Sequence, residues 1–144
     1  MNLTVWLDDW QMQCCGDPFR IGSQVSWTLT DAEKEWLTDV LGAETAETVD
    51  AAEEHHGGAP EGAAPTVATV TAISAVHCRY APRPGDPEGT RYAVPGTGTL
   101  TALSSADGWT PDRDALRFVG YLVELAVSGR RKASAGPAPQ RRRT

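Results

Sequence analysis

The chain has 144 residues, of which 40% are hydrophobic, and a formal net charge of −6. This length is typical of one domain that buries its own core, and no apolar run approaches the roughly 20 residues that a membrane span needs. The N-terminus shows no basic region followed by an apolar core, so we expect no secretory signal, a cytoplasmic location and no membrane partner.

The charge is distributed unevenly along the chain. Residues 128–144 carry six of the thirteen Lys and Arg residues and no acid, whereas residues 1–127 carry all nineteen acidic residues. An acidic body argues against a phosphate-binding face, because nucleic-acid affinity comes largely from neutralised phosphates. We therefore predict one folded domain over 1–127 and a disordered basic tail over 128–144, with nucleic acid as a candidate partner for that tail alone.

Two strands are predicted near the N-terminus. Apolar residues occupy both alternating faces of residues 3–13, which predicts a strand that is covered on both sides for part of its length. Turn-forming residues follow at 15–18, where glycine and proline lie close together. A second alternating stretch over 21–29 then indicates a strand that pairs antiparallel with the first, forming an N-terminal hairpin.

A helix is predicted over 31–41. Thr30 and Glu33 have the spacing of a capping box, an apolar stripe follows at helical spacing, and Gly42 is placed to end the helix. Residues 43–56 are acidic and rich in alanine, which is typical of a loosely docked second helix or a mobile segment. The segment 31–56 therefore forms a helical, acidic insertion after the second strand.

The rest of the domain is predicted to be β structure. Residues 57–65 have the composition of a flexible connector. Further strands are predicted over 66–80, over 92–103 with a break at Pro95-Gly96, and over 118–127. In the last of these, alternation places Val119 and Tyr121 on one face.

Several short strands in one small domain must close or pack in two layers to bury their apolar faces. We therefore expect a mainly β fold, a small and partly open antiparallel barrel of SH3-like or OB-like type with 5–6 strands. A small α+β sandwich is the alternative.

One stretch is specific enough to indicate a family. It is the N-terminal signature W-x-D-D-W-Q-M-Q-C-C-G-x-P-F over residues 6–19, and further matching pieces are Val76-His77-Cys78-Arg79-Tyr80, Asp107-Gly108-Trp109 and Phe118-Val119-Gly120-Tyr121. Together these pieces resemble an uncharacterised actinobacterial family of unknown function, from about Val5 to Leu125. The resemblance implies a bacterial, actinobacterial and cytoplasmic protein, and it implies no activity and no catalytic residue.

Six Cys and His residues are candidate metal ligands: Cys14, Cys15, His55, His56, His77 and Cys78. Zinc takes such residues in tetrahedral sets. Here they occur as adjacent pairs, and neighbours on a strand point to opposite faces, so each pair offers one ligand at most. The favoured interpretation is that the cysteines are reduced and pack as small hydrophobes, since a vicinal disulfide would strain its peptide. No cofactor is then expected, and zinc is the alternative.

A candidate ligand-binding site combines four tryptophans with nearby charged residues: Trp6, Asp8, Asp9, Trp10, Arg20, Trp27 and Trp109. Exposed aromatic residues beside a few polar groups are typical of such sites, although tryptophans on strands more often belong to the core. Asp8 and Asp9 are candidates for a general acid/base pair, but we favour a structural role in which they end the strand and accept hydrogen bonds from tryptophan or backbone N–H groups.

The favoured function is a non-enzymatic binding module that contacts an unknown protein or small ligand through a Trp-rich face of the N-terminal hairpin. The alternatives are a zinc-binding protein that uses the Cys and His residues, and an enzyme with its site at Asp8 and Asp9. No catalytic residue is assigned.

Overall fold

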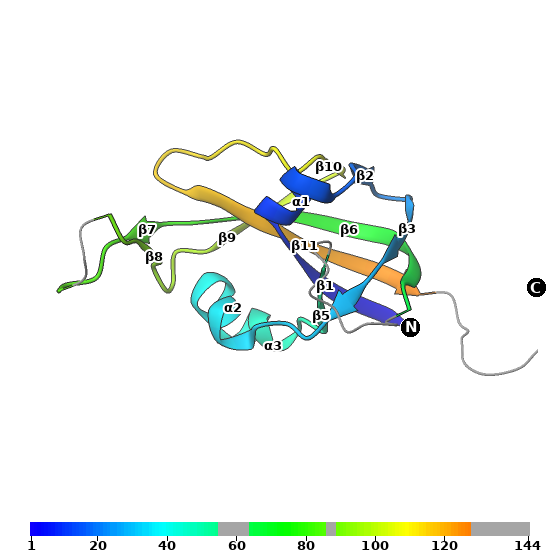
Figure 1. Cartoon of the computed structure of the whole chain (residues 1–144), viewed down its shortest axis with the longest axis horizontal. Helices are drawn as coiled ribbons and strands as arrows, with labels where there is room; N and C mark the ends of the chain where they lie inside the picture. Colours follow the sequence, from blue (N-terminus) through cyan, green and yellow to red (C-terminus); the bar gives the residue numbers. More distant parts are fainter. Residues whose placement is uncertain (55–63, 86–88, 128–144) are drawn as a thin grey trace, which may run out of the picture.

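Eleven strands and three short helices make up the computed structural model, which describes residues 1–54, 64–85 and 89–127 (Figure 1). The helices are α1 (Asp9–Cys15), α2 (Lys34–Leu41) and α3 (Ala43–Glu47). The strands are β1 (Asn2–Asp8), β2 (Phe19–Arg20), β3 (Gln24–Trp27), β4 (Leu29–Thr30), β5 (Ala51–Glu53), β6 (Thr66–Cys78), β7 (Tyr80–Ala81), β8 (Tyr92–Ala93), β9 (Thr99–Leu103), β10 (Ser105–Ala106) and β11 (Arg117–Val127). The predicted tail, and all of the predicted connector except its last two residues, lie outside the described residues.

The main sheet curls into a nearly closed barrel. Its strand order is β3-β6-β11-β1-β5-β4, with β9 also paired to β6. Only Thr28 separates β3, which pairs with β6 at one edge, from β4, which pairs with β5 at the other. This short continuous segment brings the two edges together, and the ribbon curves accordingly (Figure 1). The prediction of a small β barrel is confirmed.

Two apolar clusters cover the two faces of the sheet. Inside the barrel are Val5, Leu7, Val70, Ile73, Phe118, Tyr121, Val123 and Leu125. Outside it, α2 and α3 pack over Trp6, Val76 and Val119 with Leu37, Val40 and Val49. Because β1 carries Val5 and Leu7 on one face and Trp6 on the other, both of its faces are buried, as predicted. No helix in the described parts of the chain is long and apolar enough to cross a membrane.

The N-terminal hairpin prediction is wrong. β1 pairs antiparallel with β11 and parallel with β5, whereas β3 pairs with β6. The first strand also ends at Asp8, five residues earlier than predicted, and the chain turns into α1. Asp9 favours this helix because an acidic residue in the first turn interacts well with the helix dipole.

The helical insertion is confirmed in its main element and wrong in its details. As predicted, α2 ends at Leu41 and is capped by Gly42, whose φ of 88° suits a residue without Cβ. The predicted capping box does not form, because Thr30 belongs to β4 and Glu33 holds the N-cap position without a side-chain cap. Residues 51–53, predicted to be helical or mobile, form β5 beside β1.

Candidate functional site

The predicted ligand-binding residues divide between two pockets and the core. Trp6 and Trp27 are buried, with 3% and 7% of their surface exposed, whereas Trp10 and Trp109 are 48% and 65% exposed. Trp10 lines one pocket together with Asp8 and Asp9. Trp109 lines a second pocket together with Arg20. The single predicted site is therefore two separate ones, each with one exposed indole.

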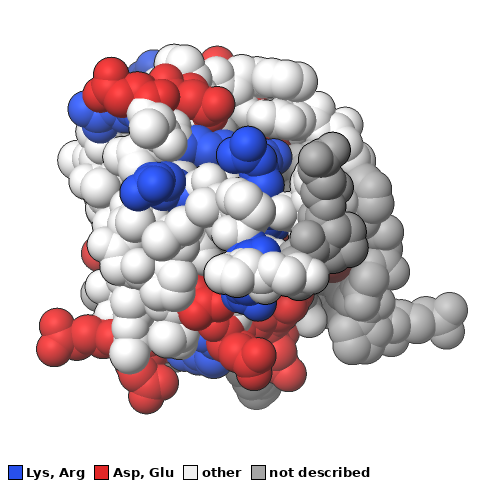
Figure 2. Space-filling model, turned by 90° about the vertical axis from the view of Figure 1, so that its left-hand side faces the viewer, with Lys and Arg blue, Asp and Glu red and all other residues white. Residues whose placement is uncertain are grey.

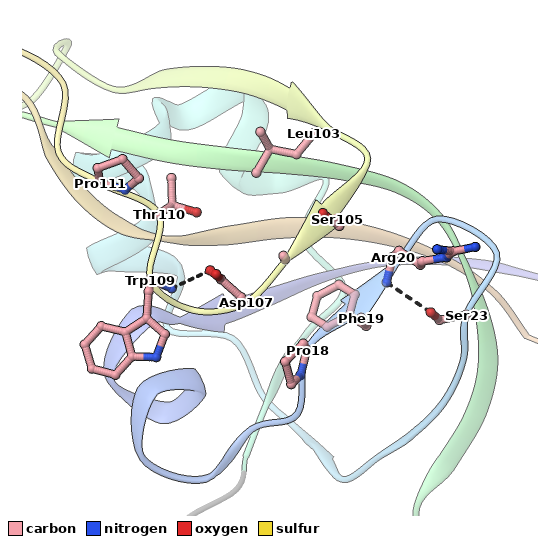
Figure 3. A pocket seen from close by; sticks show the side chains of 11 residues that line it. Pro18, Phe19, Arg20, Ser23, Leu103, Ser105, Asp107, Trp109, Thr110 and Pro111 are labelled. Atoms are coloured by element: carbon pink, nitrogen blue, oxygen red, sulfur yellow. Dashed lines mark hydrogen bonds between the residues drawn. The ribbon is translucent and has the colours of Figure 1, made fainter.

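The pocket beside Trp109 has a volume of about 530 Å³ and lies between the β2 region and the loop after β10. Its lining consists of Pro18, Phe19, Arg20, Ser23, Leu103, Ser105, Ala106, Asp107, Trp109, Thr110 and Pro111. Figure 3 shows Trp109 and Arg20 on opposite sides of this pocket, with Phe19 between them. The volume is within the range that ligand pockets occupy.

The loop over residues 107–112, here called the Trp109 loop, is held at both ends and in its middle. Asp107 Oδ1 accepts a hydrogen bond from the backbone N–H of Trp109 at 2.8 Å. The Gly108 N–H donates to the hydroxyl of Tyr121 at 3.0 Å, and that hydroxyl lies 2.7 Å from Thr110 Oγ1. Tyr121 is fully buried in the barrel, so the loop is fastened to the core.

Three further contacts complete the anchoring of the Trp109 loop. Gln13 Nε2 on α1 donates to the carbonyl of Gly108 at 2.9 Å. His77 Nε2 lies 2.9 Å from the carbonyl of Pro111, and because a carbonyl only accepts, this ring nitrogen carries the proton. The N–H of Phe118 donates to Asp112 Oδ1 at 2.8 Å. Every residue from 107 to 112 is thus a partner in at least one hydrogen bond.

Gly108 allows the Trp109 loop to pack closely on α1. Its φ is 88°, which residues with side chains rarely adopt. A Cβ at this position would also lie 2.9 Å from the Cβ of Met12. Both constraints require glycine here, and they place the exposed indole of Trp109 directly after a fixed peptide.

We expect Tyr121→Phe to lower the free energy of unfolding by about 1–3 kcal/mol, because the buried N–H of Gly108 loses its acceptor. Amide hydrogen exchange at Gly108 should accelerate at the same time. Urea denaturation and exchange measured by NMR check both results. Tyr80→Phe is the matched control, since Tyr80 is half-buried on β7 and takes no part in the hydrogen bonds that hold the Trp109 loop. Unchanged exchange at Gly108 would show that the hydroxyl does not hold the loop.

The second pocket, here called the aspartate pocket, has a volume of about 380 Å³. Its lining consists of Asp8, Asp9, Trp10, Glu33, Trp36, Tyr80, Arg117 and Val119. Asp8 is the last residue of β1 and Asp9 the first of α1. Neighbouring side chains on a strand point to opposite faces, but these two carboxylates do not diverge in this way. They share one pocket because the chain changes from strand to helix between them.

Hydrogen bonds hold Asp8 in the aspartate pocket. Its Oδ1 accepts from the indole N–H of Trp6 at 2.8 Å, and its Oδ2 lies 3.5 Å from Gln11 Nε2. The predicted structural role for this carboxylate, as a strand end that accepts a tryptophan hydrogen bond, is confirmed. An enzyme with its site at Asp8 and Asp9 would need a cleft there, and this pocket is one. The enzyme alternative stays a prediction.

Burial and neighbouring acids shape the electrostatics of the aspartate pocket. Burial raises the pKa of Asp8, the hydrogen bonds from Trp6 and Gln11 oppose the rise, and nearby carboxylates of Glu33 and Glu54 add to it. Burial also raises the pKa of Asp9, with Arg117 among the groups that oppose the rise. Figure 2, which views the end of the barrel near β7 and β8, shows basic side chains with acidic ones above and below.

The candidate metal ligands do not come together. Cys14 and Cys15 form a vicinal disulfide at the end of α1, so the expectation of reduced thiols there is wrong. Helical neighbours lie closer in direction than strand neighbours, which allows the two sulfur atoms to meet. Cys78 is a buried free thiol, as expected, and burial raises its pKa to about 11.

His77 is used to anchor the Trp109 loop, as described above. The described residues contain no group of three or more His, Cys, Asp or Glu side chains that could hold a metal ion. His55 and His56 lie outside these residues, so the zinc alternative stays a prediction.

The predicted site omitted the residues that support and complete both pockets. Tyr121 and Gln13 fasten the Trp109 loop, and Trp36, Tyr80 and Arg117 line the aspartate pocket. One signal was available in the sequence: a buried tyrosine hydroxyl or glutamine amide needs a hydrogen-bond partner. No comparable signal brings α2, β7 and β11 to the same pocket.

Comparison with known proteins places the chain in a family. No curated protein and no solved structure matches it. One family model matches residues 1–127, which include every described strand and both pockets. The chain therefore belongs to the family of unknown function DUF6578.

Proposed function

We propose that this domain is a non-enzymatic binding module that holds a basic peptide segment of a partner protein against Trp109. The observation that carries the proposal is the exposure of this indole, 65%, on a loop in which every residue from 107 to 112 takes part in a hydrogen bond. A loop fixed before binding loses little conformational entropy when a partner arrives, so more of the contact energy becomes affinity.

Tryptophan is also the residue type that most often contributes large binding energies in protein interfaces. Beside Trp109, the pocket of about 530 Å³ offers an apolar recess formed by Phe19, Leu103 and Ala106. A side chain of the partner can fill this recess while its neighbours pack on the indole. This arrangement favours a peptide over a small molecule, since the indole stands at the side of the pocket and remains largely exposed (Figure 3).

The charge of the domain favours a basic partner. Residues 1–127 carry nineteen acidic residues and only seven of the thirteen basic ones. Complementary charge accelerates association and disfavours acidic competitors, and its effect weakens as salt screens it. We therefore expect association with a basic peptide to slow as the salt concentration rises.

Selection from a displayed library of random peptides tests this function. We expect selected peptides to be basic and to bind Trp109→Ala at least about 30-fold more weakly, which corresponds to a hot-spot contribution of about 2 kcal/mol. Trp109→Ala should leave the free energy of unfolding within about 0.5 kcal/mol of wild type, because the side chain is largely exposed. Isothermal titration calorimetry and urea denaturation give the two measurements.

Val67→Ala is the matched control, since Val67 is an exposed apolar side chain on β6 that does not line the pocket. It should bind the selected peptides as wild type does. Peptides that bind wild type and Trp109→Ala equally would contradict the proposal. A library that yields no binder, together with a small molecule that binds in a Trp109-dependent way, would replace the peptide by a small ligand.

A further inference from the structure

We propose that the aspartate pocket is a second, separate binding site, which takes an organic cation: a substituted ammonium or a guanidinium group. This site does not depend on the Trp109 loop. Three properties of its lining point to this ligand class: aromatic walls, an excess of carboxylates, and a guanidinium that the chain itself places against one of the rings.

The aromatic walls come from three different elements. Trp10 on α1 is half exposed, and Trp36 on α2 and Tyr80 on β7 are each half-buried. Trp36 packs against the buried ring of Trp6 in an edge-to-face arrangement, with the ring centroids 5.5 Å apart. Ring faces attract organic cations through their quadrupole, and substituted ammonium groups are the ligands that such aromatic sites bind best.

The carboxylates give the same pocket a negative charge. Asp8, Asp9 and Glu33 line it, and Arg117 is the one basic residue in the lining. The nearby carboxylate of Glu33 helps to raise the pKa of Asp8, which shows that the acids repel one another there. A bound cation relieves this repulsion.

Arg117 shows which kind of cation the pocket accepts. Its guanidinium carbon lies 5.1 Å from the centroid of the Tyr80 ring, and its charge opposes the rise in the pKa of Asp9. The pocket thus already combines a ring face and a carboxylate around one organic cation. The lining contains three carboxylates and one arginine, so negative charge remains that can attract a second cation of the same chemistry.

The same lining disfavours metal ions. Bare metal cations need several oxygen, nitrogen or sulfur ligands that converge on one point. Among the residues that the structure describes, no three acidic, His or Cys side chains meet in this way. Aromatic walls add nothing for a metal ion, whereas they add attraction for an alkylated cation. A direct comparison of organic cations with Mg²⁺ and Na⁺ therefore tests the proposed ligand class.

Titration of the full chain with tetramethylammonium chloride and with guanidinium chloride tests the proposal, with NaCl and MgCl₂ at matched ionic strength as references. The indole N–H signals of Trp10 and Trp36 in NMR spectra report binding. We expect saturable shifts with at least one organic cation and none with the inorganic salts. The two organic arms distinguish an ammonium ligand from a guanidinium ligand.

Variants separate specific binding from general attraction to an acidic surface. Glu33→Gln should weaken binding by about threefold or more. Glu35→Gln, which changes an exposed acid in the first turn of α2 outside the lining, should not. Tyr80→Leu should also weaken binding by about threefold or more, and Tyr80→Phe, which keeps the ring, should restore it. Circular dichroism confirms that each variant is folded.

Three results would overturn the site. The first is the absence of saturable shifts with both tetramethylammonium and guanidinium, up to concentrations at which the NaCl reference perturbs the spectrum. The second is an equal response to Mg²⁺, which would reduce the pocket to an acidic surface. The third is equal affinity of Tyr80→Leu and wild type for both organic cations. Each result leaves the peptide proposal for Trp109 unaffected.

Discussion

Glu53→Gln is expected to stabilise the protein by about 3 kcal/mol at pH 7 and by up to about 5 kcal/mol above pH 8. Glu53 is the last residue of β5 and is 2% exposed. It follows Ala52, which pairs with Trp6, so strand alternation places Glu53 on the inward face with Leu7. Burial, with smaller effects of Glu54 and Asp8, raises the pKa of this carboxyl from 4.5 to about 8.

The sign of the effect follows from proton linkage. Between pH 4.5 and 8 the native state keeps the proton on Glu53, whereas the unfolded state has lost it. The native state therefore binds more protons, and the free energy of unfolding falls as the pH rises through this window. Glutamine mimics the protonated side chain and titrates in neither state, so Glu53→Gln should lose this part of the pH dependence.

Urea denaturation of wild type and Glu53→Gln at pH 5, 7 and 9 measures the effect. The two proteins should differ least at pH 5 and most at pH 9. Glu124→Gln is the control, because Glu124 is exposed on β11 and its substitution should leave the wild-type profile almost unchanged. Parallel pH profiles for wild type and Glu53→Gln would show that Glu53 ionises in the folded protein at its ordinary pKa.

The predictions that succeeded depend on local pattern alone. Apolar residues on both faces of β1 predicted that it is covered twice, and Val5 and Trp6 indeed belong to the two different clusters. Gly42 marked the end of α2 because a positive φ at a helix end favours glycine. Short alternating strands in one small domain predicted a barrel. Each of these inferences uses neighbours within a few residues.

Strand pairing was not predictable in the same way. The hairpin of 3–13 with 21–29 was the local choice, but β1 pairs with β11, more than a hundred residues further along the chain. Alternation of apolar and polar residues indicates which face of a strand is buried, but it does not indicate which strand pairs with it. Because only residues 113–116 separate the Trp109 loop from β11, its position beside Gln13 also depends on this distant pairing.

The lining of the aspartate pocket was predicted only in part, for a more local reason. Trp10 and Met12 continue the alternation of β1, so they matched a strand, although they lie on α1. A helix of seven residues has about two turns, too few for a helical period to outweigh an alternating pattern. The error mattered because it hid the strand–helix junction that brings both carboxylates to one pocket.

An irregularity in β11 reversed one face assignment. Val119 was expected on the same face as Tyr121, but it packs outside the barrel while Tyr121 lies inside. The register with β6 shifts between Phe118 and Gly120, which is a β-bulge. The bulge allows Phe118 and Tyr121 to point inward together and turns Val119 towards the aspartate pocket. Gly120 is the residue that makes this geometry possible.

Gly120→Ala is therefore expected to lower the free energy of unfolding by about 3 kcal/mol or more. A Cβ at this position would collide with the carbonyl oxygen of Leu7 and would lie 2.7 Å from Cζ2 of Trp6. Neither neighbour can yield easily, since one is backbone of β1 and the other is a buried indole held by Asp8. Overpacking of this kind typically costs 1–3 kcal/mol, and more where backbone must move.

Gly96→Ala is the comparison that isolates the steric cause. Gly96 has a φ of 83° and open space around its missing Cβ, so alanine there should cost only about 1 kcal/mol of backbone strain. Urea denaturation of the two variants gives the difference directly, and equal losses would mean that β1 and β11 separate without penalty. If Gly120→Ala costs the larger amount, the movement it forces passes through Asp8, which pairs with Gly120. The variant should then also weaken cation binding in the aspartate pocket, whereas peptide binding at Trp109 should persist for as long as the barrel remains folded.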